Sequence, residues 1–158
     1  MLKLRLADLK DTGRLARALA GVLKDGDVVL LDGEMGAGKT TMTKSLAAEL
    51  GVTDDVTSPT YTLVHSYSGG KFTLHHADLY RLKQTSEIED LGIEEMLGSG
   101  GVALIEWGAP AGQYFPGHLF VAFELGGGDT RIVTLASKSE AWQSRIAMVA
   151  SELKDLVI

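Results

Sequence analysis

A glycine-rich segment, GEMGAGKTT at residues 33–41, contains the residue types that bind phosphate groups. Gly33, Gly38, Lys39 and Thr40 match the pattern G-x-x-x-x-G-K-[ST]. The glycines let successive backbone N–H groups point at anionic oxygens, and the helix that follows directs its positive end to the same place. In such a loop the lysine neutralises the β- and γ-phosphates, and the hydroxyl is a ligand for Mg²⁺. The apolar run before the segment and the amphipathic run after it favour a phosphate-binding loop over a chance glycine-rich turn.

Two carboxylates end apolar runs further along the chain. Asp78 closes FTLHHAD at 72–78, and Glu106 closes VALIE at 102–106. A site for Mg²⁺ and a nucleotide needs a carboxylate at the end of a neighbouring strand, and a charge buried there needs a cationic partner. Asp78 is favoured as the magnesium residue, directly or through water, and Glu106 as the residue that holds a ligand water or positions the attacking one. The alternatives are a solvated strand end or helix cap for Asp78 and a plain strand exit for Glu106.

Two adjacent histidines lie in the same apolar run as Asp78. On a strand, His75 and His76 point to opposite faces, so one metal ion could not easily bind both. The chain contains no cysteine, which argues further against a zinc site. His76 is therefore expected to brace the carboxylate region or the loop beside it.

A further set of candidate residues lies in the loop between the helix that follows the glycine-rich segment and the first predicted hairpin. Thr57, Ser58 and Thr60 carry hydroxyls there, and Pro59 would stiffen the chain. A hydroxyl in this loop could sense the γ-phosphate, as ordered switch loops do in other nucleotide-binding proteins. An ordinary turn into a strand is the alternative.

Hydrophobic spacing and turn residues predict the elements that must position these side chains. Strands are expected at 2–6, 27–31, 58–67, 72–78, 102–107, 118–125 and 131–136. Helices are expected at 8–24, 40–51 and 139–156, and a capping box from Ser86 to Glu89 predicts a further short helix. Turn residues between consecutive strands predict two β-hairpins. The mixed order predicts a single α/β domain, residues 1–158, of the P-loop NTPase type, with three layers and a mixed parallel and antiparallel sheet.

The bulk composition limits the function classes. The 158 residues carry a formal net charge of −6, a pI of about 5.1 and no dense cluster of Lys or Arg. Because surface binding of nucleic acid usually requires a basic face, extensive direct contact with nucleic acid is not expected. The N-terminal sequence is unlike a signal peptide, and no apolar run approaches the ~20 residues that span a membrane. These features favour a cytoplasmic protein that does not bind a membrane.

The nucleotide follows from what the sequence lacks. Guanine-specific sites of the small-GTPase type use an Asn-Lys-x-Asp segment, and this chain contains no asparagine, which favours ATP. Metabolite kinases usually carry arginines on a lid, and no arginine-rich insertion is found. The favoured hypothesis is that the protein hydrolyses ATP and that hydrolysis serves as a conformational signal. A small-molecule phosphotransferase and a nucleotide-binding module with negligible turnover are the alternatives.

The sequence resembles the TsaE family, also called YjeE. The resemblance is carried by GEMGAGKTT at 33–41, SPTYTLVHSY at 58–67, HADLYRL at 76–82 and IEW at 105–107. These blocks occur in the family's order, and the resemblance covers nearly the whole domain. The resemblance implies a P-loop α/β domain with a mixed sheet and a Mg²⁺-dependent ATPase, slow on its own, in the synthesis of tRNA threonylcarbamoyladenosine.

The resemblance also implies roles for individual residues. Lys39, Asp78 and Glu106 would be catalytic, and Thr40, Glu106 and Asp78 would organise magnesium. The expected nucleotide-binding residues are Gly33, Glu34, Met35, Gly36, Ala37, Gly38, Lys39, Thr40, Thr41 and Trp107, with Thr12 and Arg131 as candidates for the base. The loops at 57–60 and 76–81 would act as switches or contact partners, through Ser58, Pro59, Thr60, His76, Tyr80 and Arg81.

The partners implied by the resemblance are TsaB and TsaD. In that family TsaD transfers the threonylcarbamoyl group to adenosine 37 of the tRNA, and the TsaE ATPase is thought to reset the complex between cycles. The acidic charge of this chain fits such a division, because the partners rather than this chain would hold the tRNA.

Overall fold

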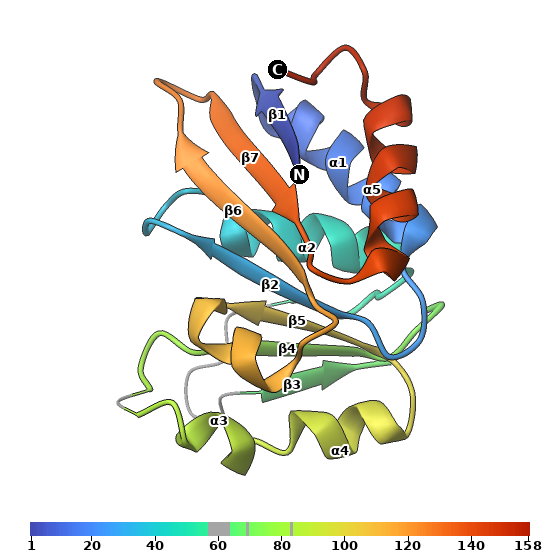
Figure 1. The fold of residues 1–158 in the computed structure, drawn as a ribbon, viewed down its shortest axis with the longest axis vertical. Coiled ribbons are helices and arrows are strands. Elements are labelled where there is room, and N and C mark those ends of the chain that lie inside the picture. Colours follow the sequence, from blue (N-terminus) through green and yellow to red (C-terminus); the bar gives the residue numbers. More distant parts are fainter. Residues whose placement is uncertain (57–63, 69, 83) are drawn as a thin grey trace.

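A seven-stranded sheet runs through the molecule in the order β1-β7-β6-β2-β5-β4-β3 (Figure 1). The computed structural model describes residues 1–56, 64–68, 70–82 and 84–158. The strands are β1 (Leu2–Leu6), β2 (Val28–Gly33), β3 (Val64–Tyr67), β4 (Leu74–Asp78), β5 (Val102–Glu106), β6 (Leu119–Leu125) and β7 (Arg131–Ala136). The helices are α1 (Leu9–Val22), α2 (Lys39–Glu49), α3 (Glu87–Asp90), α4 (Ile93–Gly98), the 3₁₀ helix η1 (Ala109–Tyr114) and α5 (Glu140–Glu152).

The sheet is mixed, as the sequence predicts. β2 is parallel to β5 and to β6, and β4 is parallel to β5. Both predicted hairpins form, because β3 pairs antiparallel with β4 and β6 with β7, and β1 adds antiparallel to β7. Since parallel strands end at the same edge of a sheet, the carboxyl ends of β2, β4 and β5 meet at one edge.

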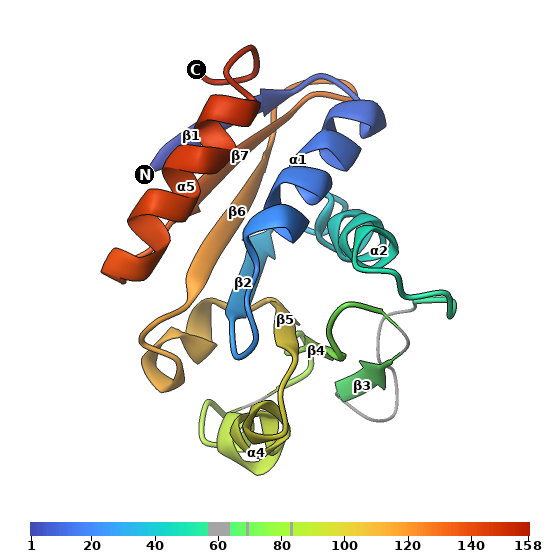
Figure 2. The ribbon, with the colours of Figure 1, turned by 90° about the vertical axis from the view of Figure 1, so that its right-hand side faces the viewer.

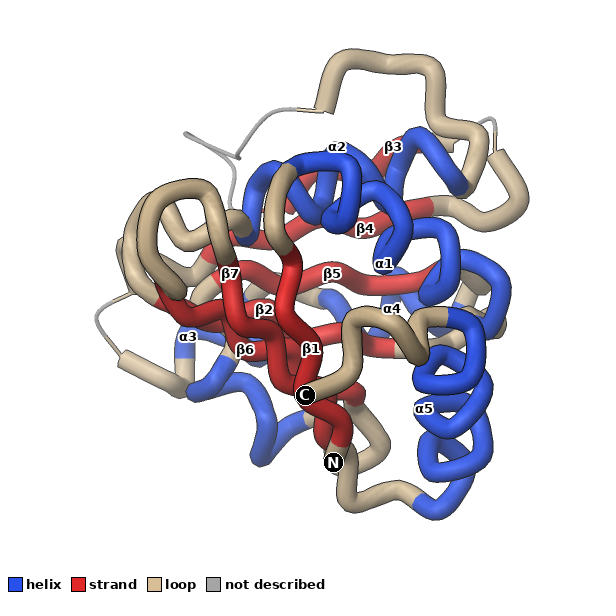
Figure 3. The backbone as a smooth tube through the Cα atoms, turned by 90° about the horizontal axis from the view of Figure 1, so that it is seen from above, coloured by secondary structure: helices blue, strands red, loops and turns tan. Residues whose placement is uncertain are grey.

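Helices cover both faces of the sheet, which confirms the three layers (Figures 2 and 3). Leu15 of α1, Met42 of α2 and Trp142 of α5 belong to one buried cluster on one face. Ile88 of α3, Ile93 of α4 and residues of η1 belong to a second cluster on the other. The β2 run is buried because its successive side chains enter the two clusters alternately, Val29 in the first and Leu30 in the second.

Several elements differ from the sequence expectation. The predicted capping box is wrong: Ser86 has helical dihedrals, and its side chain makes no capping hydrogen bond to α3. The last helix ends at Glu152 rather than 156, because the chain turns back and Leu156 O accepts a hydrogen bond from Arg5 N of β1. Helices α4 and η1 were not predicted. Of the strand expected at 58–67, residues 58–63 lie outside the described residues. No helix in the described part of the chain is long and apolar enough to cross a membrane.

The parallel pairing of β2 with β6 leaves no room for a side chain at the start of the phosphate loop. Gly33 is opposite Phe123 in the register, and a Cβ at Gly33 would lie 2.5 Å from the Phe123 carbonyl oxygen. Gly33 also has φ +142°, which side chains rarely adopt. Position 33 is therefore fixed as glycine both by its backbone conformation and by the neighbouring strand.

We expect Gly33→Ala to lower the free energy of unfolding by ~2 kcal/mol or more beyond the effect of Gly26→Ala. Gly26 is a matched control because its φ is +89° but a Cβ there would meet nothing within 4 Å. Urea denaturation of the two variants measures the difference. Equal destabilisation would show that the contact with Phe123 adds nothing to the dihedral strain.

Candidate functional site

The glycine-rich loop connects β2 to α2 and presents the amino end of that helix. Gly38 is the N-cap residue of α2 with φ +121°, and no side chain caps the helix. The first amides of an α-helix lack intrahelical partners and carry the positive end of its dipole. Because the N-cap residue is a glycine without a capping side chain, these amides can bind an anion, as the sequence pattern predicts.

Lys39 is buried at the start of α2, with its ammonium turned back into the loop. Its Nζ donates to Gly33 O at 2.5 Å and to Glu34 O at 2.9 Å, and lies 3.9 Å from the centroid of the Trp107 ring. Burial lowers the pKa of the Lys39 ammonium, and the nearby carboxylates, chiefly that of Glu106, oppose the shift. The two carbonyl oxygens accept hydrogen bonds that the Lys39 ammonium could instead donate to a phosphate.

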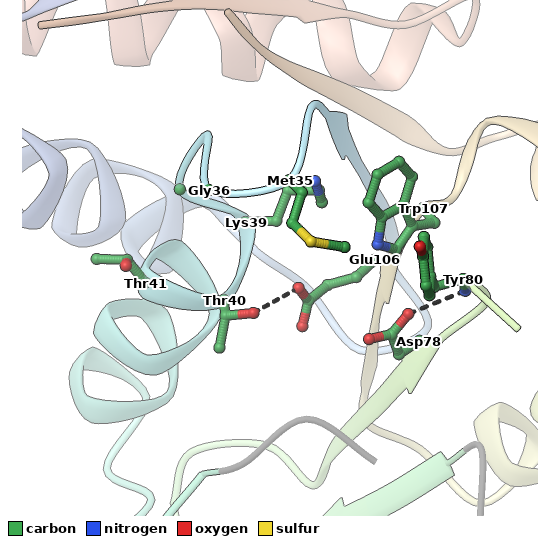
Figure 4. A pocket seen from close by; sticks show the side chains of 10 residues that line it. Met35, Gly36, Lys39, Thr40, Thr41, Asp78, Tyr80, Glu106 and Trp107 are labelled. Atoms are coloured by element: carbon green, nitrogen blue, oxygen red, sulfur yellow. Dashed lines mark hydrogen bonds between the residues drawn. The ribbon is translucent and has the colours of Figure 1, made fainter. Parts of the chain in front are cut away.

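Both predicted carboxylates lie at the same edge of the sheet as this lysine (Figure 4). The parallel register places Asp78 opposite Glu106, at the ends of β4 and β5. Thr40 Oγ1 donates to Glu106 Oε1 at 2.8 Å. Asp78 Oδ1 accepts from Tyr80 N at 3.0 Å. Burial raises the pKa of the Asp78 carboxyl and the charge of Glu106 adds to the rise, while the Tyr80 hydrogen bond opposes it.

The two adjacent histidines point in different directions, as expected for a strand. His76 is fully buried, and its Nε2 lies 2.5 Å from Glu106 Oε2. His75 is hydrogen-bonded to Ser66 Oγ at 2.8 Å and to Gly100 O at 3.3 Å. His76 therefore contacts the candidate site and His75 does not.

One pocket brings together half of the predicted site residues. Its volume is about 280 Å³, and its walls are Met35, Gly36, Gly38, Lys39, Thr40, Thr41, Asp78, Tyr80, Glu106 and Trp107. Figure 4 shows the Trp107 and Tyr80 rings beside each other on one side of this pocket, with centroids 5.0 Å apart. Trp107 has φ +56°, the one positive φ of a non-glycine residue among those described. Such strain often marks a functional position, because it persists only where the surroundings impose it.

A second pocket lies on the other side of the loop and contains the two candidates for the base. Thr12 and Arg131 line this space of about 460 Å³, which shares Gly36, Gly38 and Thr41 with the first pocket. Arg131 Nε donates to Ala37 O at 3.1 Å, and its Nη2 to Gly36 O at 3.4 Å. Arg131 is thus tied to the phosphate loop from the β6–β7 hairpin. Other lining residues were not predicted: Asp8, Leu9, Lys10, Phe123 and Asp129.

Asp32 is a site residue that the sequence reasoning missed. Its Oδ1 accepts from Gly33 N at 2.7 Å, and its Oδ2 accepts from Ala109 N at 3.1 Å. It thereby joins the start of the phosphate loop to the segment that follows β5. The signal was its position directly before Gly33, at the end of an apolar run.

The predicted switch residues are only partly placed. Ser58, Pro59 and Thr60 lie outside the described residues. Tyr80 is 56% exposed at the edge of the first pocket, whereas Arg81 is exposed and does not line it. The role of Arg81 stays a prediction.

The donor set fits a magnesium ion held mainly by a bound nucleotide. Thr40, Glu106 and Asp78 offer one hydroxyl and two carboxylates, all oxygen ligands. Among the described residues, no group of three or more His, Cys, Asp or Glu side chains could hold a metal by itself. Mg²⁺ commonly takes one or two protein carboxylates together with phosphate oxygens and water, so these residues suit that ion.

The sequence is similar to one protein family and to proteins of known name. The family profile described as "Threonylcarbamoyl adenosine biosynthesis protein TsaE" matches residues 6–138. The tRNA threonylcarbamoyladenosine biosynthesis protein TsaE of Bacillus subtilis (strain 168) is 37% identical over 153 residues, 96% of this chain and 93% of that protein. The protein of the same name from Treponema pallidum (strain Nichols) is 40% identical over 107 residues, 68% of this chain and 78% of that protein.

A solved structure agrees with this result. The crystal structure of Bacillus subtilis YdiB superposes with a TM-score of 0.80 and 31% sequence identity, over 95% of this chain and 94% of that one. The seven-stranded mixed sheet is therefore an arrangement that this neighbour shares. With the profile covering more than half of the residues, the chain belongs to the TsaE family of threonylcarbamoyladenosine biosynthesis proteins.

Proposed function

We propose that this protein binds and hydrolyses ATP as an accessory subunit in the synthesis of N6-threonylcarbamoyladenosine at position 37 of tRNA, acting with TsaB and TsaD. One observation carries the ATPase part. A single pocket at the amino end of α2 brings together the ammonium of Lys39, the hydroxyl of Thr40 and the carboxylates of Asp78 and Glu106. The family membership carries the connection to tRNA modification.

In this proposal the loop amides and Lys39 bind the β- and γ-phosphates. Lys39 exchanges its hydrogen bonds to Gly33 O and Glu34 O for bonds to phosphate oxygens. Thr40 and Glu106 would hold a magnesium ion, which when bound would neutralise charge that develops on the phosphates. Asp78 is the acidic residue needed for hydrolysis, and its carboxylate lies at the strand end, where it can orient the attacking water.

The second pocket would hold the adenosine. It adjoins the phosphate loop through Gly36 and Gly38, and Thr12 and Arg131 form part of its wall. Its lining includes negatively charged side chains, Asp8 and Asp129, and positively charged ones, Lys10 and Arg131. Such a mixture can both donate to and accept from a base edge.

Slow turnover by the isolated chain follows from the same lining. No arginine is found among the described residues that form the first pocket, and Arg131 is engaged with carbonyls of the loop. An arginine directed at the transferring phosphate accelerates phosphoryl transfer by ~10³–10⁵ where it is present. A contribution from TsaB and TsaD would therefore raise the rate. The acidic chain fits a cytoplasmic complex in which these partners hold the tRNA.

We expect Lys39→Ala to lower ATP hydrolysis by ~100-fold or more, because the ammonium stabilises charge on the phosphates. The decisive measurement mixes this chain with TsaB, TsaD, tRNA and ATP and follows threonylcarbamoyladenosine over many turnovers. The wild type should sustain synthesis and Lys39→Ala should not. Lys44→Ala is the matched control, since Lys44 is an exposed lysine on the same helix and lines neither of the two pockets.

Equal multi-turnover synthesis by the wild type and Lys39→Ala would refute the proposed role. A small-molecule phosphotransferase would give a different result: phosphate would appear on an added metabolite, and that metabolite would stimulate ATP consumption.

Asp78→Asn should separate hydrolysis from stability. The asparagine side chain can still accept a hydrogen bond from Tyr80 N. It lacks the negative charge of the carboxylate that orients the attacking water, so hydrolysis should be lost. Burial raises the pKa of Asp78 above its ordinary value of 3.8. A carboxyl whose pKa is raised by folding stabilises the fold at pH below its unfolded pKa, and this contribution is lost as the pH rises through the folded pKa. At neutral pH the ionised Asp78 therefore lowers stability relative to the neutral asparagine.

Thermal unfolding of the nucleotide-free, magnesium-free protein tests this sign. The melting temperature of Asp78→Asn should exceed that of the wild type at pH 7, and the difference should shrink as the pH is lowered toward 4. Asp54→Asn, at an exposed position outside the site, should show no such difference. A lower melting temperature for Asp78→Asn at pH 7 would contradict the assigned cause of the pKa shift.

A further inference from the structure

A line of three side chains connects the phosphate loop to the interior of the sheet. Thr40 on α2 is hydrogen-bonded to Glu106 at the end of β5, and Glu106 is hydrogen-bonded to His76 on β4. His76 is 0% exposed and Glu106 is 2% exposed. The hydrogen bond between Glu106 and His76 therefore lies inside the protein, where water cannot readily replace it, whereas Thr40 lies at the wall of the pocket.

The direction of each hydrogen bond follows from the carboxylate. An ionised glutamate can only accept, so the Thr40 hydroxyl donates to Oε1 and the His76 Nε2–H donates to Oε2. Both oxygens of Glu106 are thus held, one from the helix and one from the neighbouring strand. Rotation of the carboxylate would break both hydrogen bonds, so the orientation of Oε1 toward Thr40 depends on His76.

Packing alone does not explain a histidine at position 76. Its Nδ1 is buried and has no hydrogen-bond partner among the described residues. A buried polar nitrogen without a partner costs free energy that an apolar side chain of similar size would avoid. The neighbouring His75 differs, because both of its ring nitrogens have partners, in Ser66 and Gly100. The hydrogen bond from Nε2 to Glu106 therefore explains why position 76 is a histidine.

We propose that His76 is a positioning residue for the magnesium–nucleotide site, which holds Glu106 so that Oε1 faces Thr40 and the ion. The inference rests on the proposed function, because it assigns His76 a role in the site described there. Replacement of a residue that orients a metal-binding side chain in this way typically lowers metal affinity or activity by ~10- to 100-fold. His76 does not itself line the pocket.

The test compares His76→Leu with His76→Gln, in which the side-chain amide can still donate near the position of Nε2. Isothermal titration calorimetry gives the affinity for ADP with and without Mg²⁺, and steady-state kinetics gives kcat and KM for ATP. We expect His76→Leu to lower the Mg²⁺-dependent gain in ADP affinity and kcat by ~10-fold or more. ADP affinity without Mg²⁺ should stay within about twofold, and His76→Gln should recover most of both losses.

His75→Leu and His75→Gln are the matched controls. They alter the adjacent buried histidine, whose contacts lie on Ser66 and Gly100 rather than on Glu106. Thermal melting of all four variants identifies any that do not fold. A merely structural role would give similar losses at positions 75 and 76, equal losses with and without Mg²⁺, and no rescue by glutamine. Any of these results would overturn the proposal.

A measurement on the ligand-free protein keeps this inference separate from the ATPase proposal. Long-range ¹H–¹⁵N NMR spectra report which imidazole nitrogen carries hydrogen, and we expect a hydrogen on Nε2 of His76 that is perturbed by Glu106→Gln. A His76 ring with hydrogen on Nδ1 alone would overturn the positioning role. A wild-type protein with this Nε2–H but without any ATP hydrolysis would instead refute the proposed function.

Discussion

The buried carboxylate of Glu106 is the constraint on which the site depends. A charged group at 2% exposure costs several kcal/mol unless its surroundings compensate it. Two elements supply that compensation: α2 through the hydroxyl of Thr40 and the nearby Lys39 ammonium, and β4 through His76. Because Glu106 itself stands at the end of β5, its carboxylate fixes the relative positions of the phosphate loop and the two strands.

Lys39 links this constraint to nucleotide binding. In the ligand-free structure its ammonium is held by Gly33 O, Glu34 O and the Trp107 ring. In the proposed ATPase a triphosphate would replace these contacts, so part of its binding energy would offset their loss. Trp107, whose backbone is strained and whose ring packs on Tyr80, lies where that exchange would take place. In the proposed ATPase, occupation of the pocket would therefore change the contacts of the Trp107 and Tyr80 rings at its edge.

Much of the fold and site could be predicted because the relevant patterns are local. The phosphate loop is contiguous, and the ends of apolar runs mark Asp78 and Glu106 without knowledge of the fold. The alternation of side chains on a strand was enough to separate His75 from His76. The parallel order β2-β5-β4 then brings these residues together, since strands that run in the same direction end at the same edge.

The parts that could not be predicted depend on contacts between distant segments. The packing of Phe123 against Gly33 requires the register of β2 with β6, and the sequence between those strands does not encode that register in any short pattern. Ser86 has the residue type for a capping box, but its helical dihedrals prevent the cap, so tertiary context overrides the local preference. Asp32 was missed for a similar reason: its second partner, Ala109, is far along the chain.

In the proposed ATPase one loop would serve both parts of the nucleotide. Gly36, Gly38 and Thr41 line both pockets, so the loop adjoins a space lined by Lys39 and the carboxylates and a space lined by Thr12 and Arg131. Arg131 donates to the carbonyls of Gly36 and Ala37, so its guanidinium is tied to two carbonyls of this shared loop. An arginine directed at the transferring phosphate accelerates phosphoryl transfer, so a partner that supplied one would complete the proposed ATPase.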